Sequence, residues 1–199
     1  MQASPDINPL IIFMASILTS NMILSNFLGM CSFVSISTEY KTASGLGKSV
    51  TMVMVLTMAV NYAVYWGLIV PLGLEYLQYI IFILIIAAIV QIVEMAMDRF
   101  LPDLYVRLGI FLPLITVNCA IFGIALFMVI RQYNFLQAML FSLGSGLGWW
   151  LAINALAAIR EKIAKNKLPR GLEGPGIAFI ITGLMALAFI GFAGMFTVQ

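Results

Sequence analysis

Residues 114–123 read LITVNCAIFG, and they place a cysteine at the centre of a long apolar run. The nearest charged residues, Arg107 and Arg131, each lie twelve positions from Cys119. A helix needs about 20 mainly apolar residues to cross the hydrocarbon core of a bilayer. The stretch around Cys119 therefore predicts a membrane-spanning segment with a thiol near its middle.

The composition indicates that the whole chain belongs in a membrane. Of its 199 residues, 63% are hydrophobic and 9% are charged, and the mean hydropathy is +1.09. Soluble domains carry roughly 25% charged residues, so this chain could not cover its apolar surface in water. The length suits one compact bundle, and we predict a single membrane domain over residues 1–199. Because the sequence contains no histidine, the chain cannot use histidine to ligate haem, zinc or copper, or for acid–base catalysis.

Apolar runs of sufficient length predict an all-α integral membrane protein with six transmembrane helices. The breaks between the runs contain turn residues or charges, such as STEYKTASGLGKS at 37–49 and DRFLPD at 98–103. We expect no cleaved signal peptide, because the first residues lack a basic region and the first apolar run is too long. The predicted helices lie at roughly 10–36, 49–70, 77–97, 105–130, 136–158 and 176–197.

The distribution of basic residues predicts the orientation, because cytoplasmic loops are enriched in lysine and arginine. Nine of the ten basic residues fall in the loops after the first, third and fifth predicted helices, and only Arg131 falls on the other side. We therefore expect those three loops to be cytoplasmic and both termini to be periplasmic. The nine residues are Lys41, Lys48, Arg99, Arg107, Arg160, Lys162, Lys165, Lys167 and Arg170.

The six helices divide into two sets of three, at about 10–97 and 105–197. An odd number of spans per half predicts two inverted repeats, which in transporters meet near the bilayer midplane. The first helix of each half contains one cysteine, Cys31 or Cys119. Both helices contain residues that break or crowd a helix, so we expect them to be discontinuous, with each cysteine at the break. These residues are Asn21, Asn26 and Gly29 in the first helix, and Gly109, Pro113, Asn118 and Gly123 in the fourth.

The two cysteines admit three interpretations from the residues alone. A cysteine in a buried helix often serves only as a small hydrophobic side chain. A structural disulfide is typical of oxidising compartments and not of the bilayer interior. The third interpretation is metal ligation, but an iron–sulfur cluster normally needs four thiolates. This chain could supply only half of such a site and would need a second chain for the rest.

Several stretches resemble the family of E subunits of the sodium-translocating NADH:quinone oxidoreductase, a six-subunit respiratory pump of the bacterial inner membrane. The most specific is GIFLPLITVNCAIFG at 109–123, and the resemblance extends from about residue 10 to the end. A close relative that shares the motif is the A subunit of the Rnf electron-transport complex. Val117 and the triplet Asp98-Arg99-Phe100 resemble the sodium-pump branch. The other matching stretches are NMILSNFLGMCSF (21–33), QIVEMAMDRFLPDLY (91–105), GSGLGWWLAINALAAIREK (144–162) and GIAFIITGLMALAFIGFAGM (176–195).

The resemblance implies an electron-relay subunit of a translocase, without a complete active site of its own. In that family, the D and E subunits are homologous and inverted, and each contributes two cysteines to one intramembrane 2Fe-2S cluster. Cys31 and Cys119 match the two ligand positions. The implied electron path runs from the flavin and cluster of the F subunit, through this site, to the flavin of the C subunit, and the B subunit then delivers electrons to quinone. The implied partners are the A, B, C, D and F subunits, together with membrane lipid, and no flavin is expected in this chain.

Three polar residues within the predicted helices carry further hypotheses. Glu94 lies four residues before Asp98, close to the predicted cytoplasmic end of its helix, which favours an interfacial cap or salt bridge over sodium binding. Asn21 and Asn118 could orient the broken backbone or the thiolates, with simple helix–helix hydrogen bonding as the alternative. GLGKS at 45–49 lacks the first glycine of a phosphate-binding loop, and nothing in the sequence indicates nucleotide or nucleic-acid binding.

Functions of another class fit part of the same pattern. Inverted repeats and broken helices also occur in small secondary transporters and channels. An assembly scaffold without a cofactor would be equally apolar. Neither class needs both cysteines, so replacement of Cys31 and Cys119 separates an electron relay from these alternatives.

Overall fold

The computed structural model describes residues 8–100, 115–164 and 174–191, and the regular structure within these ranges is helical. This confirms the predicted all-α class. Three short segments join α3 to α5, namely the π-helical turn η1 (Tyr65–Ile69), α4 (Val70–Leu72) and the 3-10 turn η2 (Glu75–Leu77). The other helices are α1 (Pro9–Ile17), α2 (Met30–Ile36), α3 (Tyr40–Val64), α5 (Gln78–Phe100), α8 (Cys119–Ile130), α9 (Phe135–Ile163) and α10 (Pro175–Ile190).

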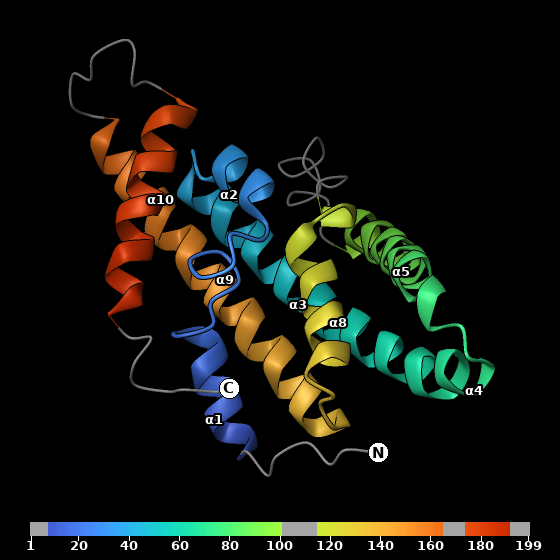
Figure 1. The fold of residues 1–199 in the computed structure, drawn as a ribbon. Helices are drawn as coiled ribbons and strands as arrows, with labels where there is room; N and C mark the ends of the chain where they lie inside the picture. Colours follow the sequence, from blue (N-terminus) through green and yellow to red (C-terminus); the bar gives the residue numbers. More distant parts are fainter. Residues whose placement is uncertain (1–7, 101–114, 165–173, 192–199) are drawn as a thin grey trace.

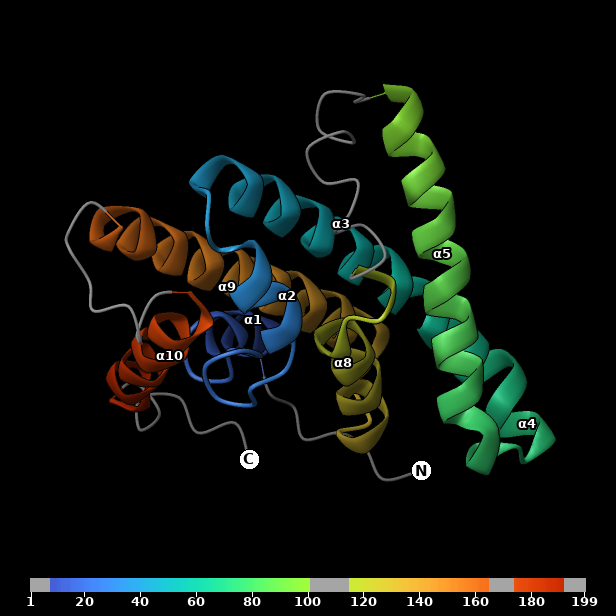
Figure 2. The same ribbon diagram turned by 90° about the horizontal axis from the view of Figure 1, so that it is seen from above.

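The long helices α3 and α9 pack against each other at the centre of the bundle (Figure 1). Helices α1 and α10 pack on α9, whereas α5 lies on the far side of α3, as both views show (Figures 1 and 2). Helix α8 contacts α3, α5 and α9. Of the three long helices, α9 is the most buried and α5 the least. The exposed side chains of α5 include Ile80, Ile83 and Leu84, an apolar surface typical of contact with lipid.

Three helical stretches in the described ranges are long and apolar enough to cross a membrane. They are Tyr40–Leu72, Glu75–Arg99 and Phe135–Ile163, and they correspond to the second, third and fifth predicted helices. The apolar helices α8 and α10 are shorter. Residues 105–114 of the fourth predicted helix and 192–197 of the sixth lie outside the described residues. The six-helix plan, the inverted repeats and the periplasmic termini therefore stay predictions.

The first predicted helix is discontinuous, as the sequence indicates. Helix α1 ends at Ile17 and α2 begins only at Met30. The Asn21 side chain organises the connection between them: Nδ2 donates to the carbonyl oxygens of Ile17 (3.2 Å) and Gly148 (2.9 Å), and Oδ1 accepts from the Ile23 N–H (3.1 Å). Asn21 thus replaces helical hydrogen bonds that the break removes, as buried backbone at membrane depth requires.

The predicted start of the second helix, near residue 49, is wrong. Helix α3 already begins at Tyr40, so most of the predicted first loop is helical. The prediction placed Gly45 and Gly47 in the loop before this helix. At Gly47 a Cβ atom would overlap the side chain of Trp150 on α9. Glycine here permits close approach of two helices, a role that is common in membrane bundles.

Candidate functional site

Cys119 is the first residue of α8 and lies directly after an interruption of the helical structure. Its predecessor Asn118 has extended backbone angles (φ −72°, ψ 112°) and caps the helix, because its Oδ1 accepts from the N–H of Ala120 at 3.0 Å. This is a typical N-cap interaction. Of the breaking residues predicted for this segment, Gly109 and Pro113 lie outside the described residues, and Gly123 lies within α8.

Cys31 occupies the corresponding place in the first broken segment. It is the second residue of α2, after Gly29, which has a left-handed backbone conformation (φ +85°). Each cysteine therefore lies in the first turn of a helix that follows a break. Both thiols are free, so the structure contains no disulfide between them. Cys31 is exposed on the surface of the chain, whereas Cys119 is half-buried.

The two breaks meet in space. The Gly29 N–H donates to the Sγ atom of Cys119 at 2.8 Å. Cys31 follows Gly29 by two residues, so the Cα atoms of Gly29 and Cys31 lie within about 7 Å of each other. A second hydrogen bond joins the same two turns, from Asn118 Nδ2 to Ser32 Oγ at 3.2 Å. We call Gly29, Cys31, Ser32, Asn118 and Cys119 the cysteine junction.

The tight packing at Gly29 includes a buried donor with no acceptor. A Cβ atom at Gly29 would lie 2.8 Å from Nε1 of Trp149 and 3.1 Å from Oδ1 of Asn118. Trp149 is fully buried, and among the described residues its indole N–H has no hydrogen-bond partner. A buried N–H of this kind usually has an acceptor, and an unmet one costs about 1–3 kcal/mol. A free donor therefore lies beside Gly29, whose own N–H donates to the thiol of Cys119.

The composition of the junction suits half of a metal–thiolate site. Thiolates are the ligands that iron–sulfur clusters use, and the N–H of Gly29 can stabilise a negatively charged sulfur. The twelve-residue helix α8 places its positive end at Cys119. Among the described residues, no three Cys, Asp or Glu side chains come together to hold a metal. The missing ligands would have to approach from outside, on the side where Cys31 is exposed.

The sequence of this chain matches a known family of membrane proteins along most of its length. Residues 10–196 match the profile described as Rnf-Nqr subunit, membrane protein. The chain belongs to the Rnf-Nqr family.

Three similar Rnf-Nqr proteins are each named as the E subunit of a Na(+)-translocating NADH-quinone reductase. The protein of Serratia proteamaculans is 51% identical over 190 residues, that of Klebsiella pneumoniae 50% and that of Shewanella denitrificans 48%. These alignments cover 92%, 92% and 90% of this chain and 96%, 96% and 94% of the respective relative.

The remaining predicted polar residues lie at different places in this Rnf-Nqr protein. Asn118 belongs to the cysteine junction, and Asn21 holds the break in the first segment, so both contact broken backbone. Glu94 is half-buried on α5, six residues before the end of that helix. Nothing in the sequence indicates a role for Ser32, and the pair Trp149-Trp150 indicates only packing, which the full burial of Trp149 confirms. From the sequence alone, Trp149 and Trp150 are equivalent, so the sequence does not show which indole lies beside Gly29.

We expect Gly29→Ala to destabilise the protein by about 1–3 kcal/mol, because alanine is strained at φ +85° and its Cβ would press on Trp149. The measurement is thermal unfolding of the purified protein in detergent. Gly73→Ala is the matched control, since Gly73 also has positive φ (+64°) but has open space around it. A larger loss for Gly73→Ala would contradict the steric argument at the junction.

Proposed function

We propose that this chain is the E subunit of a sodium-translocating NADH:quinone reductase in a bacterial inner membrane, where it relays electrons across the bilayer. The observation that carries the proposal is the cysteine junction, in which the Gly29–Cys119 hydrogen bond joins the two broken segments that contain Cys31 and Cys119. The identity of about half the residues to proteins named as this subunit supports the assignment. A small transporter or a scaffold has no need for such a pair of thiols.

In this proposal, Cys31 and Cys119 supply two of the four ligands of a 2Fe-2S cluster, and the homologous D subunit supplies the other two. When bound, the cluster accepts and donates one electron at a time. The Asn118–Ser32 hydrogen bond joins the turn that contains Cys31 to the turn that contains Cys119. The Gly29 N–H stabilises the charge on the Cys119 sulfur. The neighbouring side chains of Phe33, Ala120 and Trp149 are fully buried and keep water from the inner side of the junction.

The rest of the proposed reaction takes place in the partner subunits. Reduction by NADH, flavin chemistry and quinone reduction are assigned to the A, B, C and F subunits. This chain therefore acts only as part of the complex, in which electron transfer is coupled to sodium export. The alternative is the A subunit of an Rnf complex, which shares the cysteine motif but links ferredoxin or NADH to its redox partners. Identity to the sodium-pump proteins favours the E subunit.

The proposal is tested on the purified wild-type complex and on a complex that carries Cys31→Ala and Cys119→Ala together. Iron, acid-labile sulfide and the EPR spectrum after stepwise reduction are measured on both. We expect the double variant to lack one 2Fe-2S cluster per complex while retaining all six subunits. Equal iron and sulfide in the two preparations would reject this chain as a cluster ligand.

We expect Trp149→Phe to keep the cluster but to lower its midpoint potential by roughly 20–60 mV, the shift that one lost hydrogen bond to sulfur produces in a one-electron couple. Among the described residues its indole N–H has no acceptor, and it lies beside Gly29 of the junction. The measurement is an EPR-monitored redox titration of the intact complex. Trp150→Phe is the control, because that indole N–H donates to Ser44 Oγ at 3.4 Å. Identical potentials in both variants would show that Trp149 does not donate to the cluster.

A further inference from the structure

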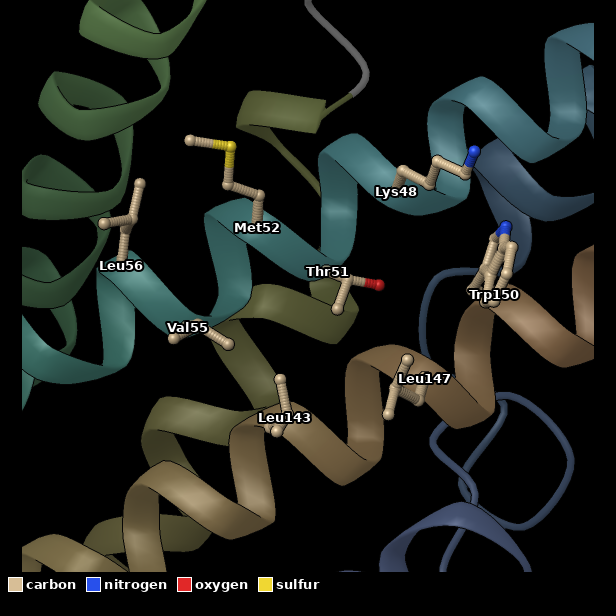
Figure 3. Close-up of a pocket in the computed structure, with 8 residues that line it drawn as sticks. All are labelled: Lys48, Thr51, Met52, Val55, Leu56, Leu143, Leu147 and Trp150. Carbon is tan, nitrogen blue, oxygen red and sulfur yellow. The ribbon is translucent and has the colours of Figure 1, made fainter.

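A groove lies between α3 and α9, away from the cysteine junction. Its volume is about 410 Å³, and its lining is apolar apart from Lys48 and Thr51. Figure 3 shows Lys48 and Trp150 at one end and Leu56 at the other, with Leu143 and Leu147 along the α9 side. Met52 and Leu56 are exposed, so the groove opens to the surroundings of the chain.

A second groove, of about 520 Å³, lies on the other side of α3, against α5. Lys41, Ser44 and Lys48 line it, together with apolar side chains such as Met97. Lys48 and Met52 border both grooves, so the grooves lie on either side of the same part of α3. No acidic side chain of the described residues lines either groove.

The two lysines are spaced to act on one ligand. Lys41 and Lys48 are seven residues apart, which places them on the same face of α3 two turns from each other. Both are exposed. Ser44 lies between them, and its hydroxyl accepts from the Trp150 indole N–H at 3.4 Å. This face therefore combines two positive charges, a hydroxyl and an aromatic side chain.

The position of these residues along α3 corresponds to a membrane interface. The helical stretch Tyr40–Leu72 has 33 residues, a length of about 50 Å, whereas the hydrocarbon core is about 30 Å thick. Lys41 and Lys48 lie within the first 12 Å or so of this stretch, at the depth of lipid headgroups. Met52 and Leu56 follow one and two turns deeper. Basic residues at the headgroup end of an apolar groove match the shape of a phospholipid.

We propose that these two grooves bind one anionic phospholipid, with its phosphate at Lys41 and Lys48 and an acyl chain in the groove between α3 and α9. Net negative charge is required, because two exposed lysines with no acidic neighbour in the grooves attract an anion more strongly than a zwitterion. The sequence predicts this end of α3 to be cytoplasmic, where phosphatidylglycerol or cardiolipin would be the available lipids. The proposal is independent of the cluster and of the electron path.

The test uses the intact complex in phosphatidylcholine vesicles that contain photoactivatable phosphatidylglycerol or, separately, photoactivatable phosphatidylcholine. After irradiation, crosslinks to peptides of α3 and α9 are quantified by mass spectrometry. We expect phosphatidylglycerol to label the groove far more than phosphatidylcholine. Lys41→Gln and Lys48→Gln should each reduce this preference about fivefold, the effect of removing one interfacial charge.

Two further variants separate the groove from general effects of charge or folding. Lys162→Gln removes an exposed positive charge elsewhere, on α9, and should leave the preference unchanged. Leu143→Trp fills the groove and should reduce acyl-chain crosslinks without a change of charge. Three outcomes would overturn the proposal. The two lipids could label the groove equally, or Lys162→Gln could reduce labelling as much as Lys48→Gln does. The bound lipid could also be displaced by a quinone analogue but not by phosphatidylglycerol.

Discussion

Complexes with Cys31→Ser or Cys119→Ser should lose quinone reduction by at least about 100-fold, since even outer residues of metal sites affect activity by 10–100-fold. Either change removes one of the two thiols in the cysteine junction, where the Gly29 N–H donates to Cys119 Sγ. Serine has nearly the same size as cysteine but is a poor ligand for iron–sulfur clusters. The backbone and the Asn118–Ser32 hydrogen bond are left in place, so we expect the chain to fold and the complex to assemble.

The position at which electrons stop distinguishes a relay from a general defect. With NADH added, flavin on the donor side of this chain should become reduced at the normal rate, whereas flavin on the acceptor side should stay oxidised. Stopped-flow absorbance resolves the two groups. Ser35→Ala is the matched control, because Ser35 is an exposed residue of α2 one turn after Cys31. This control should behave as wild type in iron content and rate.

The two single variants also discriminate between the rival classes of function. If both retained all iron and full turnover, the thiols would be ordinary small side chains, and a scaffold or an ion-conducting role would remain. If only one variant lost iron, the ligand set would differ from two cysteines in each of two chains. Loss of assembly in both would make the serine variants uninformative, so the complex is also prepared with alanine at each position.

The broken first segment could be predicted because its causes are local. Asn21 and Gly29 are residues that end helices or adopt positive φ, and the structure shows both in such roles. Cys31 and Cys119 were correctly expected at breaks. In each segment the residues that interrupt helices lie close to the cysteine, and most other positions are apolar residues that form regular helix. These predictions depend on residue types within a few positions of each other, which the sequence displays directly.

The contacts between segments could not be predicted in the same way. Gly47 resembles a loop residue until its neighbour Trp150, more than a hundred residues away in sequence, is known. The hydrogen bond from Gly29 to Cys119 spans 90 residues. Trp149 and Trp150 are adjacent in sequence, but only the first is fully buried at the junction. Such contacts depend on how α1, α3 and α9 pack, and apolar periodicity carries little information where every face is apolar.

We expect Gly148→Leu to disrupt the packing of α1 on α9 and, with it, the cysteine junction. Even a Cβ atom at Gly148 would lie 2.9 Å from the Ile17 carbonyl oxygen and 2.9 Å from Asn21 Nδ2. Backbone atoms cannot move aside as a flexible side chain would. Overpacking typically costs 1–3 kcal/mol, and a lost Asn21–Gly148 hydrogen bond adds about 1 kcal/mol or more. The sum of roughly 2–5 kcal/mol is a large part of the 5–15 kcal/mol that stabilises a typical protein.

The readouts are the amount of chain that joins the complex and the rate at which a maleimide reagent modifies Cys31. Gly183→Leu is the control, because Gly183 on α10 has open space around its Cα atom and shares the helical setting of Gly148. We expect normal assembly in the control, and poor assembly with altered Cys31 reactivity in Gly148→Leu. Wild-type behaviour of Gly148→Leu would mean that α1 can shift without moving the cysteines. The link from α9 through Asn21 to the first broken segment would then be unnecessary for the structure of the cysteine junction.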